Sequence, residues 1–127
     1  MKQHIIPVIL MVQLFSNCTT TEKTIPSEFR PKSSPYKHAV LLYGRPSCGN
    51  TRFFSRKMQK EEIPFIFHNI NAEDRIYRAR VNKKMFELVE SVNPKINFFG
   101  LPVVDVNGKV LISPFWWRFK RELHRLK

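Results

Sequence analysis

The sequence predicts an α/β fold in which helices flank a central mixed sheet of four strands. Two short apolar runs, 38–43 and 65–70, lie on either side of an amphipathic stretch at 50–62. A strand, helix, strand order of this length predicts a right-handed parallel crossover. Two alternating runs at 101–112 are joined by Asn107-Gly108, whose residues tolerate positive φ and favour a hairpin. We therefore expect a parallel β-α-β unit followed by an antiparallel hairpin.

Local residues predict where the helices begin and end. Phe53, Phe54 and Met58 recur at helical spacing, and Pro64 ends that helix. Apolar residues at helical spacing predict a second helix over about 71–94. We expect a last helix from Ser113 onward, with Ser113 as its N-cap and the following proline at its first position.

Composition limits the classes of function. The chain has 127 residues, 43% of them hydrophobic, which fits one compact domain and excludes a fully disordered or coiled-coil protein. A net charge of +12 favours anionic large partners. The two cysteines, Cys18 and Cys48, cannot form a disulfide framework or a four-cysteine zinc site. The four histidines share no metal-ligand spacing, so no metal site is expected.

The first residues have the layout of an export signal. Over 1–17, a basic start at Lys2 is followed by an apolar stretch and a small polar exit before Cys18. A helix over 5–15 would span about 16 Å, against about 30 Å of hydrocarbon, so no permanent transmembrane helix is expected. The segment resembles a bacterial lipoprotein signal, which implies lipidation of Cys18. Simple secretion, or an amphiphilic anchor with a free thiol, are the alternatives.

The segment after the signal separates it from the folded part. Residues 18–37 lack apolar periodicity and hold three prolines, so we expect a flexible, lipid-anchored tether before a folded domain at 38–127. A generic disordered tail is the alternative. The arrangement predicts an exported, monomeric protein held on a membrane of the bacterial cell envelope. Nucleic acid is then not an expected partner.

Three segments of the folded part resemble the glutaredoxin family, which has the thioredoxin fold. They are Tyr43-Gly44-Arg45-Pro46-Ser47-Cys48-Gly49-Asn50-Thr51, Gly100-Leu101-Pro102 and Val106-Asn107-Gly108-Lys109. The first is similar to the family's active-site segment, the second to the segment that holds its cis-proline, and the third to its hairpin. The resemblance covers about 38–126 and implies a thioredoxin-like arrangement of the predicted sheet.

Cys48 is the residue to which we assign the chemistry. A cysteine at a helix N-terminus faces unpaired backbone N–H groups and the positive end of the dipole, which favour thiolate, and Arg45 and Arg52 add to this. The resemblance implies that this thiolate attacks a disulfide or a glutathione adduct. Thr51 replaces the second cysteine of the dithiol form, which implies monothiol chemistry with an external resolving thiol. An inert buried cysteine is the alternative.

The resemblance also implies which residues contact the substrate. Because Pro102 has no N–H, we expect the Leu101 backbone to be free to pair with an extended sulfur-bearing peptide. Arg45 matches a lysine that meets a glutathione carboxylate in the family. After the hairpin, however, Ile112-Ser113-Pro114-Phe115 stands where the family has the Gly-Gly and Asp that grip glutathione, so another small thiol is the alternative co-substrate. The full set expected around the substrate or glutathione is Tyr43, Arg45, Thr51, Arg52, Leu101 and Pro102.

The expected function is that of a membrane-tethered thiol-disulfide oxidoreductase. Cys48 would form mixed disulfides with a disulfide-bearing protein or thiol adduct, with glutathione or another low-molecular-weight thiol as co-substrate and no tightly bound cofactor. Two alternatives stay open. Pro46-x-Cys48-Gly49-x-Thr51-Arg52 also resembles the opening of the arsenate reductase family. A binding module with little turnover is the other.

The last helix is rich in aromatic and basic residues. We expect its rings to belong to the core and to cover the hairpin rather than to form a binding stripe. Its basic residues would lie near anionic headgroups if the anchor holds the domain at a membrane. The aromatic residues concerned are Phe115, Trp116, Trp117 and Phe119.

Overall fold

The computed structural model describes residues 24–126, so the predicted signal peptide and Cys18 lie outside the described residues. No helix within this range is long and apolar enough to cross a bilayer. The elements in chain order are β1 (Glu28–Phe29), β2 (Val40–Gly44), α2 (Gly49–Lys60), β3 (Phe65–Asn69), α3 (Arg75–Val92), β4 (Val103–Val106), β5 (Lys109–Ile112) and α4 (Trp116–His124).

The described strands form one mixed sheet in the order β1-β3-β2-β4-β5. β2 and β3 are parallel, with Leu42 opposite Phe67, and α2 connects them. β4 pairs antiparallel with β2 on its other side and with β5 through a hairpin whose turn residues, Asn107 and Gly108, both have positive φ. The predicted α/β class, the parallel β-α-β unit and the hairpin are thus confirmed.

The sheet has five strands, and the prediction of four is therefore wrong. The additional strand β1 pairs antiparallel with β3, with Phe29 opposite Phe65. It lies within 18–37, the segment expected to be a tether, and Ile25, Phe29 and Tyr36 of that segment pack against the core. A two-residue strand with isolated apolar neighbours produces no periodicity, so sequence patterning could not detect it. The sheet therefore begins before residue 38.

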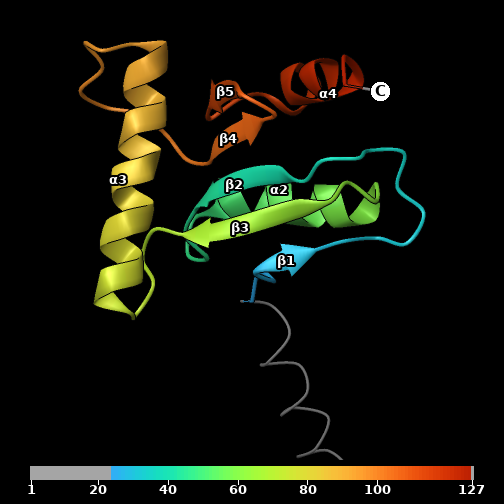
Figure 1. Ribbon diagram of the computed structural model, residues 1–127, viewed down its shortest axis with the longest axis horizontal. Coiled ribbons are helices and arrows are strands. Elements are labelled where there is room, and N and C mark those ends of the chain that lie inside the picture. The colour runs from blue at the N-terminus through green and yellow to red at the C-terminus, as the bar shows by residue number, and fades with distance from the viewer. Residues whose placement is uncertain (1–23, 127) are drawn as a thin grey trace, which may run out of the picture.

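Helices cover both faces of the sheet (Figure 1). Side chains alternate along β2, so Leu42 packs toward α2 and α4, whereas Tyr43 packs toward α3. Phe54 of α2 and Phe119 of α4 meet edge to face, with ring centroids 5.5 Å apart. On the other face, α3 contributes Val81 and two further buried residues of the same stripe. Two apolar clusters thus hold the sheet between them.

The last helix begins later than the sequence predicts. Ser113 is not its N-cap and Pro114 is not its first residue, because Phe115 is the N-cap and α4 begins at Trp116. Ser113 has a φ of 43° and donates its N–H to the carbonyl of Pro102 over 2.8 Å. The residue expected to cap α4 instead ties the end of β5 to the segment before β4.

His68 of β3 lies at the contact between the sheet and α3. Its ring stacks on Tyr43 with centroids 4.8 Å apart, and its Nδ1 is 3.3 Å from the hydroxyl of Tyr77. Burial lowers the pKa of His68. A histidine in the unfolded chain has a pKa of about 6.5. As the pH falls, His68 therefore becomes protonated in the unfolded chain before it does in the folded protein.

We predict that the free energy of unfolding falls as the pH is lowered from about 7 toward 5, because protonation of His68 favours the unfolded chain in this window. His68→Phe keeps a ring against Tyr43 and should flatten this dependence. Denaturant titration at several pH values measures this dependence, and His124→Gln, which replaces an exposed histidine at the end of α4, is the matched control. An unchanged pH dependence in His68→Phe would contradict the assignment.

Candidate functional site

Cys48 lies in the loop between β2 and α2, at the N-cap of α2. Its backbone is extended, its carbonyl accepts from the N–H of Arg52 over 3.1 Å, and its own N–H donates to the carbonyl of Arg45 over 3.0 Å. No side chain caps the helix, and the thiol is half-buried. The first-turn N–H groups of a helix have no intrahelical partner, so the sulfur lies where a negative charge is stabilised.

A close contact between Gly44 and Thr51 sets where α2 begins. Gly44 ends β2, and Thr51 lies fully buried in the first turn of α2. A Cβ on Gly44 would lie 2.5 Å from Oγ1 and 2.6 Å from Cγ2 of Thr51, closer than non-bonded atoms approach. Only a glycine lets this threonine pack against the end of β2, and the contact thereby positions Cys48.

The pKa of the Cys48 thiol is lowered by its surroundings. The largest single effect is that of burial, which by itself raises the pKa of Cys48. The hydroxyl of Thr51, the backbone N–H groups of Thr51 and Asn50, and the charge of Arg45 act in the other direction and outweigh burial. Stabilisation of the charged form by hydrogen bonds and a nearby cation is what makes a cysteine nucleophilic near neutral pH.

The hydroxyl of Thr51 is in an unusual position for a buried polar group. Among the described residues its Oγ1 has no hydrogen-bond partner, although buried hydroxyls are normally paired. The Cys48 thiolate is the acceptor that would satisfy it, because this hydroxyl lowers the pKa of that thiol. Thr51 therefore acts through Cys48, and its burial keeps it from contacting a substrate directly.

The two arginines expected beside Cys48 differ in what they do. Arg45 is exposed, and its charge helps to lower the pKa of Cys48. Arg52 donates from Nη1 to the carbonyl of Pro46 over 2.9 Å, so its guanidinium holds the Cys48 loop. Of the two arginines, Arg45 is therefore the one whose guanidinium is accessible to an anionic group of a substrate.

Leu101 and Pro102 lie beside the first turn of α2. Their peptide bond is cis, as the resemblance implied. The Leu101 carbonyl accepts from Asn50 Nδ2 over 3.3 Å and from the Ser113 hydroxyl over 3.2 Å. The expectation that this backbone is free is therefore wrong for the carbonyl, whose two lone pairs already have partners. Pairing with a peptide at this oxygen would require Asn50 or Ser113 to move.

Tyr43 is placed in the core instead of at the surface around Cys48. Its side chain is 3% exposed and stacks on His68 under α3. Burial, followed by the charge of Asp105, raises the pKa of its phenol. Of the residues expected around the substrate, Tyr43 thus serves packing, whereas Arg45, Thr51, Arg52 and Leu101 lie in or next to the Cys48 loop.

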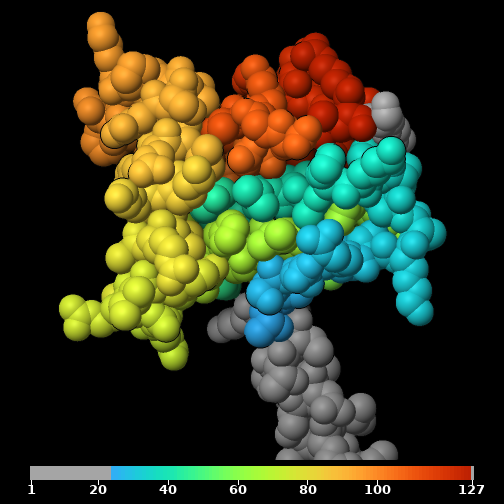
Figure 2. Space-filling model, viewed as in Figure 1, coloured from blue at the N-terminus to red at the C-terminus, as the bar shows by residue number. Residues whose placement is uncertain are grey.

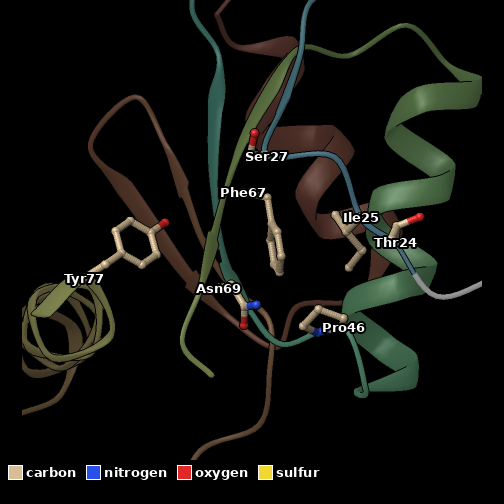
Figure 3. Close-up of a pocket in the computed structure, with 7 residues that line it drawn as sticks. All are labelled: Thr24, Ile25, Ser27, Pro46, Phe67, Asn69 and Tyr77. Carbon is tan, nitrogen blue, oxygen red and sulfur yellow. The ribbon is translucent and has the colours of Figure 1, made fainter. Parts of the chain in front are cut away.

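A pocket of about 390 Å³ lies beside the same loop (Figure 3). Pro46 of the loop is one of its lining residues, and Phe67 and Ile25 lie on one side of β3 with Tyr77 on the other (Figure 3). The segment before β1 thus forms part of the surface next to the Cys48 loop. The full lining is Thr24, Ile25, Ser27, Pro46, Phe67, Asn69 and Tyr77.

Sequence reasoning missed two polar residues that assemble this site. Asn50 and Ser113 are 3.4 Å apart (Nδ2 to Oγ), and both contact the Leu101 carbonyl. Asn50 lies within the segment that resembles the family's active site but is given no role there, and Ser113 is expected only to cap the last helix. Among residues 24–126, no group of three or more His, Cys, Asp or Glu side chains is placed to hold a metal ion.

Comparison of the chain with protein-family models, with curated proteins and with solved structures found no match. The site is therefore interpreted from its own geometry.

We predict that Gly44→Ala lowers the free energy of unfolding by about 1–3 kcal/mol, the range for overpacked interiors. In a Thr51→Ala background the effect should be smaller, because the two nearest atoms are gone. Denaturant titration of the two single variants, the double variant and the wild type measures this coupling.

Gly49→Ala is the matched control for this cycle. A Cβ there meets nothing closer than 3.9 Å, at Arg52 Nη2, so little change is expected. If Gly44→Ala lowers the free energy of unfolding equally in the wild type and in Thr51→Ala, the contact with Thr51 is not the reason that residue 44 must be glycine.

Proposed function

We propose that this chain is a glutaredoxin-like thiol-disulfide oxidoreductase with a thioredoxin-like domain and Cys48 as its single nucleophile. The observation that carries the proposal is the position of Cys48 at the N-cap of α2, where the Thr51 hydroxyl, two backbone N–H groups and Arg45 lower the pKa of its thiol against the effect of burial. The parallel β2-α2-β3 unit, the β4–β5 hairpin and α3 on the opposite face support the fold assignment.

The reaction is a pair of thiol-disulfide exchanges. The Cys48 thiolate attacks one sulfur of a substrate R–S–S–R′, so that a Cys48–S–S–R bond forms, the R–S–S–R′ bond breaks, and R′–S⁻ leaves with the electron pair and takes up a proton. An external thiol R″–SH, deprotonated to thiolate, then attacks the R sulfur. Cys48 leaves as thiolate and R–S–S–R″ is released. The net result is that R″–S takes the place of R′–S in the disulfide: the R′ sulfur is reduced to a thiol, and the sulfur of the external thiol is oxidised to the disulfide level.

The external thiol is required because Thr51 stands where a resolving cysteine would be. Among residues 24–126, Cys48 is the only cysteine. Glutathione or another low-molecular-weight thiol would be the co-substrate, and the exposed Arg45 would bind its carboxylate. No tightly bound cofactor takes part in this scheme.

The proposed setting is the bacterial cell envelope. The apolar segment before Cys18 supports export and lipidation of that cysteine, which would hold the domain on a membrane as a monomer. The partner would then be a disulfide-bearing protein or a thiol adduct rather than nucleic acid. A binding module with little turnover and an arsenate-reductase-like enzyme are the alternatives, and the reactivity of Cys48 separates the first of them from the proposal.

We predict that alkylation of Cys48 in the full chain reaches half its maximal rate at a pH below the pKa of about 8.5 of an unperturbed cysteine. Peptide-resolved mass spectrometry separates Cys48 from Cys18, and Cys48→Ser is the blank. The same protein should reduce bis(2-hydroxyethyl) disulfide with glutathione as the thiol, and Cys48→Ser should not. A half-maximal pH at or above that of free cysteine, with no turnover, would leave a binding module as the better account.

We also predict that Thr51→Val moves the alkylation profile of Cys48 to higher pH without lowering stability. The variant removes the hydroxyl that stabilises the thiolate, and it also removes a buried polar atom that has no partner in the described structure. Alkylation profiles and denaturant titration at pH 6 measure the two effects.

Ser55→Ala is the matched control for this substitution, because it removes a buried hydroxyl one turn farther along α2 that bonds Gln59. Its alkylation profile should follow the wild type. An unshifted profile in Thr51→Val would show that the hydroxyl does not act on Cys48.

A further inference from the structure

We propose that four rings beside the site, Phe53 of α2 and Phe115, Trp116 and Trp117 at the start of α4, form a docking surface for the polypeptide that carries the substrate disulfide. We name this surface the aromatic shelf. The shelf binds a stretch of this substrate polypeptide that is apolar and acidic and lies next to the cysteine of the substrate disulfide. The inference rests on the proposed function, because the shelf lies on the two helices next to the Cys48 loop and would select what Cys48 reacts with.

Hydrogen bonds place the shelf next to the nucleophile. Asn50, two residues after Cys48, donates to the Leu101 carbonyl and lies 3.4 Å from the Ser113 hydroxyl. These contacts hold the residues that precede α4 against the first turn of α2. Phe53 lies about one helical turn beyond Asn50, and its ring meets Trp116 edge to face at 6.2 Å. A chain bound along the shelf would therefore lead directly to Cys48.

Packing within the domain does not account for the outer rings. Trp116 is partly buried and packs against the core, with its ring centroid 5.4 Å from that of Phe54 and 5.1 Å from that of Phe119. Phe115 and Trp117 are instead 73% and 61% exposed and stack on each other at 6.4 Å. The expectation that these two rings belong to the core is wrong. In the space-filling view α4 forms an outer edge of the molecule beside the β4–β5 hairpin (Figure 2).

The charges around the shelf indicate what it attracts. Lys57 lies 5.5 Å from the Trp116 ring, and Arg121 lies 5.4 Å from the Trp117 ring. The single acid within α2 and α4 is Glu122, which is 8% exposed and pairs with Arg125. Lys120 of α4 forms an ion pair with Glu61, the C-cap of α2. The other lysines and arginines of these two helices are Arg52, Arg56, Lys57, Lys60, Arg118 and Arg121.

Exposed rings bordered by cations fit a partner that combines apolar side chains with carboxylates. Stacked aromatic rings supply large contact areas at little loss of conformational entropy, which is why they recur at binding hot spots. A tripeptide thiol could reach Arg45 but offers no apolar side chain to the rings. A bilayer seated on the shelf would cover the approach to Cys48 and Leu101. A polypeptide segment uses both the rings and the adjoining nucleophile.

The test compares a small disulfide with peptide disulfides in the full chain. The small substrate is bis(2-hydroxyethyl) disulfide. The peptide substrate is a short peptide whose central cysteine carries a 2-mercaptoethanol disulfide, flanked by phenylalanine and leucine with a glutamate at each end. Two further peptides replace the glutamates by lysines, or the phenylalanine and leucine by alanines. The variant is Phe115→Ala/Trp117→Ala, and Ile76→Ala, 77% exposed on α3, is the matched control.

We expect kcat/KM for the apolar acidic peptide to fall about tenfold or more in the double variant, as for loss of binding hot spots. Turnover of the small disulfide should stay within about twofold, because the shelf does not contact the reacting sulfurs. Wild-type protein should prefer the apolar acidic peptide to both altered peptides, and Ile76→Ala should behave as wild type.

The outcomes separate the two proposals. If wild-type protein reduces neither class of disulfide, the proposed function fails and the shelf with it. If the small disulfide is reduced but the peptides show no preference, or the double variant affects both substrates equally, only the shelf is overturned. It is also overturned if the substitutions leave peptide turnover unchanged but abolish binding to anionic phospholipid vesicles, or dissociate a dimer seen by sedimentation, since the occupant would then be a bilayer or a second copy.

Discussion

The packing of Thr51 against Gly44 is the contact on which the arrangement of this site depends. It brings the first turn of α2 against the end of β2, within a distance that a Cβ at residue 44 would not allow. Phe54 and Met58 follow on the same helix and are buried against the sheet, so the core holds α2 in the position that this contact sets. Cys48, as the N-cap between the two elements, has little freedom to lie elsewhere.

The Thr51 hydroxyl bears both on the stability of the fold and on the pKa of Cys48. A buried hydroxyl without a partner is a destabilising feature, and proteins retain such features mainly where function requires them. Here the neighbouring sulfur gives the hydroxyl a role as soon as Cys48 loses its proton. The Thr51 hydroxyl and the backbone N–H groups of Asn50 and Thr51 lower the pKa of Cys48, so they favour the thiolate over the thiol.

Segments far apart in the sequence complete the surroundings of Cys48. Asn50 lies 51 residues from Leu101 and 63 from Ser113, and its amide group touches both. The segment before β1 reaches the other side of the loop and lines the pocket beside Pro46. Cys48 is therefore bordered by α2, by the segments flanking β4 and β5, and by the N-terminal part of the fold, and α4 adds exposed rings to this border.

Local patterns in the sequence determined the α/β class, four of the five strands, the course of the described helices, and the location of Cys48 between a buried strand and a helix. These features depend on residues a few positions apart, whose periodicity and turn chemistry are visible in one dimension. The tertiary structure alone decided that β1 joins the sheet, that Ser113 binds Leu101 instead of capping α4, that Thr51 Oγ1 has no hydrogen-bond partner among the described residues, and that Phe115 and Trp117 remain exposed. Each of these depends on which distant surfaces meet once the core has formed, and the packing of the whole domain settles that choice.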